Sequence, residues 1–334
     1  MTSRRAPARR MRIAALALAA LVAAALGGCA APGARELSGD LAVHDPSYAV
    51  SDGTQYVYST GAANVADGAI QIRSSTDGST WRYRGEVWAD KPAWLAEAVP
   101  GVSNLWAPEL IEHEGTWYLY YSASTFGSNT SVIALATNTT LDPDDPGYEW
   151  VDRGEVLAST SGDDFNAIDP GIVVDASGAP WMAFGSFWSG IRMVPLDWPD
   201  GLRASAGEPL RLADRRSPPN AVEAPYIVEH DGDYFLFVSF DSCCQALEST
   251  YHVVVGRADA VTGPYVDREG VPLLNGGGTV VLDADGDVHI GPGGQSVADG
   301  TLAVHYYDRR LDGAFQLALV PLIWDAEGWP IADW

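Results

Sequence analysis

Cysteine is scarce in this sequence. Its 334 residues contain three cysteines, and only Cys243 and Cys244 lie beyond the first thirty residues. So few cysteines exclude the disulfide framework that holds many small secreted domains together. Because these two residues are adjacent, they could form a strained vicinal disulfide or remain as two buried thiols, and the sequence leaves both possibilities open.

Positive charge is scarce as well. The chain has 20 Lys and Arg against 44 Asp and Glu, which gives a formal net charge of −24 at pH 7. An acidic surface of this kind repels nucleic acid and anionic lipid. The composition therefore excludes nucleic acid as a partner, and we expect a soluble acidic surface and a monomer.

Long hydrophobic runs are limited to one segment near the start. Five arginines precede an apolar run over residues 13–26, which is too short for a comfortable membrane span and is typical of an export signal. The run ends in Leu-Gly-Gly-Cys29, which resembles the bacterial lipoprotein signal. We expect residues 1–28 to be a removed signal peptide, Cys29 to be acylated and residues 29–40 to form a short linker. The alternative is a plain secretory peptide; in both cases the protein is exported, to the cell envelope or beyond it. Removing residues 1–28 takes five positive charges and changes the net charge to −29.

Helical periodicity is absent from the rest of the chain. Short aromatic and β-branched runs alternate with Asp-Gly-type turns, a pattern that indicates an all-β fold. Five X-Pro steps open five similar units, and the prolines lie 62, 62, 55 and 67 residues apart. These prolines are Pro46, Pro108, Pro170, Pro225 and Pro292.

Each X-Pro step is followed by a turn dipeptide and a second strand, such as Asp52-Gly53 before residues 55–59 and Asp231-Gly232 before residues 234–239. Repeats of about 60 residues with about four antiparallel strands are typical of propeller blades. We therefore expect a single five-bladed β-propeller over residues 41–334. A β-sandwich also has short, evenly spaced strands, but it does not explain the fivefold register.

The repeat starts carry three carboxylates. In a propeller the first strand of each blade lines the central channel, so equivalent residues converge around one axis. Asp45, Asp169 and Glu223 stand at these positions together with Trp106. Crowded acids raise one another's pKa, so one can stay protonated while another is ionised, as glycoside cleavage requires. Each acid alone could be a turn former, and Trp106 could be either a sugar-stacking platform or a core residue.

An ordered series of motifs resembles the endo-α-1,5-L-arabinanases of glycoside hydrolase family 43. The similar strings include Val-His-Asp-Pro-Ser at 43–47, Asn-Leu-Trp-Ala-Pro-Glu at 104–109, Asn-Ala-Ile-Asp-Pro at 166–170 and Glu-Ala-Pro-Tyr-Ile at 223–227. The resemblance covers residues 41 to 334 and implies a five-bladed propeller that hydrolyses arabinan with inversion.

The resemblance also implies roles for individual residues. Asp45 would be the general base, Glu223 the general acid, and Asp169 the group that orients Glu223 and tunes its pKa. Further substrate-binding positions would be His44, Trp106, Phe126, Gly127, Asn166, Ala167, Ile168, Ser186, Phe187, Trp188 and His305.

One position departs from the family pattern. Arabinanases of this type usually carry a histidine near a metal ion after the Gly-Pro-Gly of the last repeat, where this chain has Gly294. His305 in the next strand could reach the channel instead, although such a histidine is more often a packing residue. The chemistry requires no cofactor, and a structural Ca²⁺ in the channel is a possibility that the sequence leaves open.

Three functions remain open at this point. The first is an endo-acting arabinan hydrolase. The second is an exo-acting arabinofuranosidase or β-xylosidase on the same scaffold. Loop height decides whether the groove is open or closed at one end, and the sequence does not predict it. The third is a surface propeller that binds glycans without cleaving them, which predicts the loss of at least one carboxylate.

Overall fold

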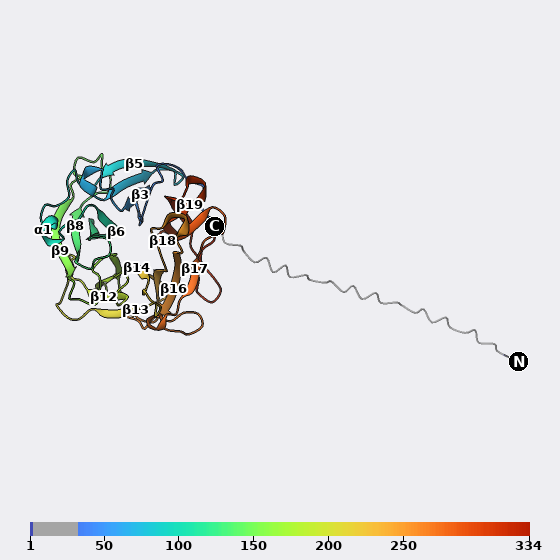
Figure 1. Cartoon of the computed structure of the whole chain (residues 1–334). Coiled ribbons are helices and arrows are strands. Elements are labelled where there is room, and N and C mark those ends of the chain that lie inside the picture. Colours follow the sequence, from blue (N-terminus) through green and yellow to red (C-terminus); the bar gives the residue numbers. More distant parts are fainter. Residues whose placement is uncertain (3–32) are drawn as a thin grey trace. The chain divides into compact units, whose positions relative to one another are not determined.

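The computed structural model describes residues 1–2 and 33–334. Residues 3–28 of the predicted signal peptide, together with Cys29, lie outside these residues. Within the described part the regular structure is almost entirely β-strand, arranged as sheets around a central axis (Figure 1). The predicted five-bladed β-propeller is confirmed. One short α-helix, α1 (Leu95–Ala98), precedes the second blade, and no helix in the described residues has the length and hydrophobicity needed to cross a bilayer.

Each blade is an antiparallel sheet whose strands follow one another in the chain. Blade 1 contains β2 (Ser47–Ser51), β3 (Thr54–Ser59), β4 (Gln71–Ser75) and β5 (Thr80–Glu86). Blade 2 contains β6 (Leu105–His113), β7 (Thr116–Ala123), β8 (Ser131–Asn138) and β9 (Val151–Ser159). Blade 3 contains β10 (Gly171–Val174), β11 (Pro180–Phe184), β12 (Ile191–Pro195) and β13 (Leu210–Ala213). Blade 4 contains β14 (Val222–His230), β15 (Asp233–Phe240), β16 (His252–Ala258) and β17 (Thr279–Leu282). Blade 5 contains β18 (His289–Ala298), β19 (Thr301–Asp308) and β20 (Ala314–Pro321).

The first strands of the blades form the inner ring. β2 contacts β6, β6 contacts β10, and the sequence continues through β14 and β18 back to β2. Figure 1 shows the consequence: the first blade, in blue, lies next to the last blade, in red. The starts of these five strands therefore meet around one axis.

The hydrophobic core consists of five clusters, one between each pair of neighbouring blades. For example, Tyr58 of blade 1 shares a cluster with Leu119 of blade 2, and Val43 before blade 1 shares a cluster with Leu317 of blade 5. The other three clusters join blades 2 and 3, blades 3 and 4, and blades 4 and 5. A sandwich would have one core between two sheets, so this distribution excludes it.

The ring is closed by the segment before blade 1. The N–H of Arg35 donates to the carbonyl of Leu319, and the carbonyl of Leu41 accepts from the N–H of Leu317. This segment thus supplies an outer partner to the three-stranded blade 5. Within it, β1 (Ser38–Gly39) pairs in parallel with β5 of blade 1. The part of the expected linker that the structure describes, residues 33–40, is therefore held between the first and last blades.

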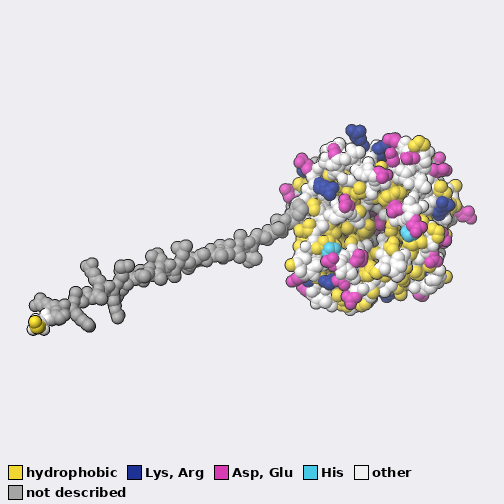
Figure 2. Space-filling model, turned by 180° about the vertical axis from the view of Figure 1, so that it is seen from behind, with side chains coloured by type: hydrophobic (Ala, Val, Ile, Leu, Met, Phe, Trp, Pro, Cys, Tyr) yellow, Lys and Arg dark blue, Asp and Glu magenta, His cyan; other side chains and the backbone are white. Residues whose placement is uncertain are grey.

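After β20 the chain ends in a small hairpin of β21 (Ile323–Trp324) and β22 (Pro330–Ile331). Figure 2 shows one face of the molecule, with hydrophobic side chains toward its centre and acidic side chains around its edge. This distribution agrees with the acidic, solvent-exposed surface that the composition predicts.

Candidate active site

The residue before each of the five prolines has a left-handed backbone. The φ angles are 51° at Asp45, 40° at Ala107, 56° at Asp169, 51° at Ala224 and 55° at Gly291. In β14 this conformation makes a bulge, because Glu223 pairs with Ser239 while Tyr226 pairs with Phe237, leaving two residues opposite one. A left-handed non-glycine residue costs about 1–3 kcal/mol and persists only where its surroundings enforce it. Here the same conformation recurs at one place in every blade, and in four of the five blades the residue is not glycine.

A large cleft of about 1530 Å³ opens above these bulges. Most of the residues expected at the site line it: His44, Asp45, Trp106, Phe126, Gly127, Asn166, Ile168, Asp169, Ser186, Phe187, Trp188 and Glu223. Two expected residues do not. Ala167 packs in the hydrophobic cluster between blades 2 and 3, and His305 is fully buried behind His44. Neither side chain is placed to touch a sugar in the cleft.

Asp45 is held by groups that favour its ionised form. Its Oδ2 accepts a hydrogen bond from Oγ1 of Thr60 at 2.7 Å and lies 2.8 Å from Nδ1 of His44. Burial alone would raise the pKa of Asp45, but the charge and hydrogen bond of His44 and the hydrogen bond from the Thr60 hydroxyl together lower the pKa below its ordinary value. Asp45 is therefore a carboxylate across the physiological pH range.

Glu223 and Asp169 are shifted in the opposite direction. Burial, followed by the negative charge of Asp45, raises the pKa of Glu223, although Oε2 accepts a 2.6 Å hydrogen bond from Oγ of Ser186. Burial and the charges of Glu223 and Asp45 raise the pKa of Asp169 well above its ordinary value. Oδ2 of Asp169 also accepts the N–H of Ala224 at 3.2 Å, which ties it to the strand that carries Glu223. The pair retains a proton at pH values where an ordinary carboxyl has lost it.

Hydroxyls at the ends of the second strands connect each blade to the next. Thr60 accepts the N–H of Ala107, and Ser122 accepts the N–H of Asp169. Ser186 donates to Glu223, and Ser239 accepts the N–H of Gly294. These hydroxyls fix the repeat starts. The motifs indicated Ser186 as a sugar contact but not its bond to Glu223, and they indicated no role for Thr60, Ser122 or Ser239. The signal was available, because four of the second strands end in a serine and Thr60 follows the first of them.

His305 takes this role in the last blade. Its Nδ1 accepts the N–H of Asp45 at 3.1 Å, and its ring stacks on that of His44 with centroids 3.7 Å apart. Burial and the charge of His44 lower the pKa of His305 well below its ordinary value, so the ring is neutral and its proton lies on Nε2. His305 is thus a positioning residue for Asp45.

The residues of the channel do not fit a calcium ion held by protein ligands. Calcium takes six to eight oxygen ligands. Among the described residues, the group of possible ligands next to the channel is His44, Asp45 and His305, which offers one carboxylate, and Nδ1 of His305 is already engaged. A side chain at Gly294 would also collide, since its Cβ would lie 2.5 Å from Oδ1 of Asp45 and 2.8 Å from Nδ1 of His305. The histidine usual in this family therefore has no space in the present arrangement.

Comparison with known proteins agrees with the fold and with the family that the motifs indicate. The profile of glycosyl hydrolases family 43 matches residues 39–330. The extracellular endo-α-(1→5)-L-arabinanase 1 of Bacillus subtilis is 38% identical over 290 residues, which is 86% of this chain and 87% of that protein. The extracellular exo-α-(1→5)-L-arabinofuranosidase ArbA of Cellvibrio japonicus is also 38% identical, over 87% of this chain and 86% of its own length.

A solved structure of a family 43 enzyme has the same fold. The family 43 endo-arabinanase of Bacillus licheniformis superimposes with a TM-score of 0.83 at 41% identity, covering 89% of this chain and 99% of that one. The resemblance inferred from the motifs is confirmed, and the chain belongs to family 43 of the glycosyl hydrolases.

Proposed function

We propose that this protein hydrolyses the internal α-1,5-L-arabinofuranosidic bonds of arabinan with inversion. One observation carries the proposal: a half-buried carboxylate with a lowered pKa, Asp45, shares the floor of the cleft with a carboxyl pair of raised pKa, Glu223 and Asp169. Two carboxyls whose pKa values are pushed apart are what acid–base cleavage of a glycoside needs.

In the proposed reaction, Asp45 removes a proton from a water molecule while the water oxygen attacks the anomeric carbon of the bound sugar. Glu223 donates its proton to the departing glycosidic oxygen, and the bond between that oxygen and the anomeric carbon breaks. A single displacement of this kind inverts the anomeric configuration. Thr60 and His44 hold Asp45 in place, and Ser186 holds Glu223. We assign Asp169 to keep Glu223 protonated to higher pH, because two neighbouring carboxyls oppose each other's ionisation.

The size of the cleft supports endo action. Small-molecule pockets commonly measure about 300–1000 Å³, and the cleft of about 1530 Å³ exceeds that range. Its lining comes from four blades: Phe126 lies in blade 2, Trp188 in blade 3, Cys243 and Cys244 in blade 4, and Phe315 in blade 5. A cleft lined from four blades around the carboxylates suits an internal stretch of a polysaccharide.

The decisive experiment follows the products released from linear debranched arabinan over time. Endo action predicts a mixture of oligosaccharides early in the reaction, with a rapid loss of viscosity. Release of a single short product from the start would replace the proposal with exo action, the activity in the name of the Cellvibrio japonicus relative. Binding without any product would favour the non-catalytic propeller.

We further propose that the protein acts outside the cytoplasm as a monomer, held at the cell envelope if Cys29 is acylated. The names of the Bacillus subtilis and Cellvibrio japonicus relatives describe extracellular enzymes, which supports export. Replacing Cys29 by Ser should release the protein from the membrane fraction into the medium; membrane association that survives the replacement would contradict the lipid anchor.

A further inference from the structure

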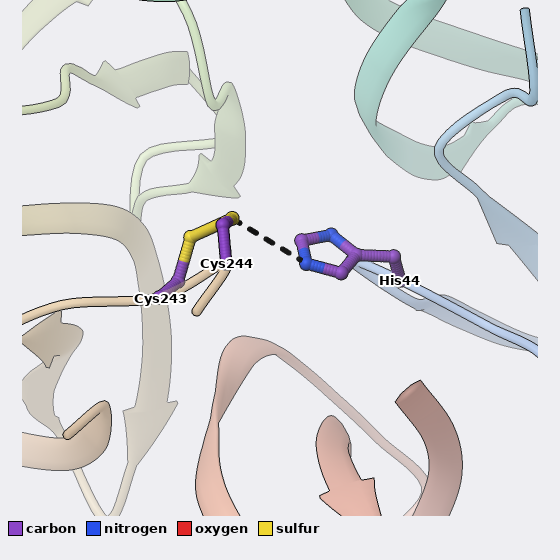
Figure 3. A group of neighbouring side chains, drawn as sticks. All are labelled: His44, Cys243 and Cys244. Atoms are coloured by element: carbon purple, nitrogen blue, oxygen red, sulfur yellow. Dashed lines mark hydrogen bonds between the residues drawn. A yellow bond between two sulfur atoms is a disulfide. The ribbon is translucent and has the colours of Figure 1, made fainter. Parts of the chain in front are cut away.

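Cys243 and Cys244 form a disulfide in the loop that follows β15, on the wall of the cleft. Cys243 is half-buried and Cys244 is exposed. Figure 3 shows the imidazole of His44, from the start of blade 1, pointing at the sulfur of Cys244 in blade 4; Nε2 lies 3.8 Å from that sulfur. The disulfide is therefore next to the pair of His44 and Asp45. The family motifs gave no substrate-binding role to the other residues of this part of the cleft.

This part of the wall is largely apolar. Phe315 is 40% exposed, lines the same cleft and places its ring edge-on to His44, with centroids 5.3 Å apart. Ala246 and Gly313 complete the wall around the two sulfur atoms. A disulfide has no S–H donor, so its sulfur face adds apolar surface, whereas two thiols would add rotating polar groups.

The wall is held rigidly. The N–H of Cys244 donates to the hydroxyl of Tyr307 at 2.7 Å, and that hydroxyl lies 3.2 Å from Nε2 of His44. Further hydrogen bonds pin the loop on both sides of the disulfide, from Ser242 to Thr250 and from Gln245 to Ser249. A surface that is already ordered loses little conformational entropy when a ligand binds, so its contacts contribute more fully to affinity.

We propose that the Cys243–Cys244 disulfide and Phe315 form a sugar-binding subsite that contacts the C–H face of an arabinofuranosyl residue next to Asp45. This inference rests on the proposed function. Phe126 and Trp188 line another part of the cleft, and a polysaccharide bound across the carboxylates needs contacts on both sides of them. The subsite contributes to substrate affinity rather than to the chemical step.

The test compares three proteins: Cys243→Ala/Cys244→Ala, Phe315→Ala and a control, Leu210→Ala, which removes a hydrophobic side chain that is 44% exposed outside the cleft lining. Dissociation constants for linear arabino-oligosaccharides are measured by calorimetry in a Glu223→Gln background, and KM and kcat are measured on linear arabinan in the active enzyme. Both cleft variants should raise Kd and KM about tenfold, the effect of losing one hydrophobic contact, with kcat changed less than about threefold. The control should change none of them.

Reduction of the wild-type protein gives a second route if the double variant fails to fold. A small dithiol would be oxidised to its own disulfide while the protein disulfide becomes two thiols, and the gain of two titratable thiols monitors the reaction. The reduced enzyme should show the same rise in KM and recover on reoxidation. Unchanged Kd and KM in folded Phe315→Ala and in the double variant or reduced enzyme would overturn the subsite, as would a fall in kcat alone. If the wild-type protein neither binds nor cleaves arabinan, the proposed function itself fails.

Discussion

Asp45 is a half-buried carboxyl and Glu223 a buried one, and their neighbours move their pKa values in opposite directions. Asp45 lies beside His44, whose positive charge and hydrogen bond lower its pKa. Glu223 lies beside no cation that outweighs burial and the charge of Asp45, so its pKa is raised. A difference of local contacts is thus enough to assign a base and an acid to chemically similar groups.

Replacing Ser186 by Ala should move the alkaline limb of the pH profile of kcat/KM to higher pH. The Ser186 hydroxyl stabilises ionised Glu223, so its removal raises the pKa of Glu223 further. The active form carries the proton, and activity is therefore present below this pKa and lost as pH rises through it. A control, Ser128→Ala, removes a cleft serine whose side chain contacts no carboxylate in the described structure. An alkaline limb that stays in place or moves to lower pH in Ser186→Ala would contradict the assignment of Glu223.

The sequence predicted the three acids because all of them stand at equivalent places in the repeats. It did not predict the contacts of Tyr307 and His305, because these residues reach His44 and Asp45 across the junction between the first and last blades. That junction exists only once the ring has closed. The burial of His305 behind His44 could not be predicted for the same reason, since it depends on the stacking of two side chains 261 residues apart in the chain.

At the scale of the strands, the recurring X-Pro step was the clearest sequence signal of the repeats. The left-handed backbone of the residue before each proline was the conformation least expected from the sequence. Proline disfavours the helical region for the residue before it, so an extended backbone is the ordinary expectation. Four of the five residues are instead non-glycine and left-handed. Side chains of the preceding blade accept their backbone N–H groups: a hydroxyl at Ala107 and at Asp169, the ring of His305 at Asp45, and the carboxylate of Asp169 at Ala224. The period of the repeats could be predicted from the sequence, but the backbone strain at the repeat starts depends on tertiary contacts.

Replacing Ala107 by Gly should therefore stabilise the protein. Its φ of 40° costs an L-residue about 1–2 kcal/mol, which exceeds the usual loss of about 0.5–1 kcal/mol when glycine replaces alanine. We expect the free energy of unfolding, measured by denaturant titration, to rise by about 0.5–1 kcal/mol. The matched control, Ala314→Gly at an exposed position of β20, should lower it. A loss of stability in Ala107→Gly equal to that in the control would show that the backbone stores no strain there.

At the scale of the whole molecule, closure of the ring depends on the segment before blade 1. A chain that begins at residue 42 lacks the backbone hydrogen bonds from Arg35 and Leu41 to β20 and the pairing of β1 with β5. We expect its Tm to fall by at least about 5 °C relative to a chain that begins at residue 33, given about 2–4 °C per kcal/mol for a domain of this size. Equal melting temperatures in calorimetry would mean that this segment does not close the propeller.

The ligands available around the central channel predict how the protein responds to the removal of calcium. The donor set of the channel does not match the six to eight oxygen ligands of this ion. Treatment with EDTA, followed by removal of the chelator, should therefore leave kcat and Tm unchanged. A loss of either that added Ca²⁺ restores, and Mg²⁺ does not, would establish a calcium site made mainly of water ligands.

The roles of Asp45 as general base and Glu223 as general acid are best tested by the anomeric configuration of the first product. If Asp45 activates water while Glu223 protonates the leaving oxygen in a single displacement, the new reducing end appears first as the β-anomer. Proton NMR of an arabino-oligosaccharide reaction, recorded faster than mutarotation, distinguishes the anomers. With a single displacement, the β signal should appear first and the α signal should follow as the anomers equilibrate. An α-anomer that appears first would show retention through a covalent intermediate and would contradict the role assigned to Asp45.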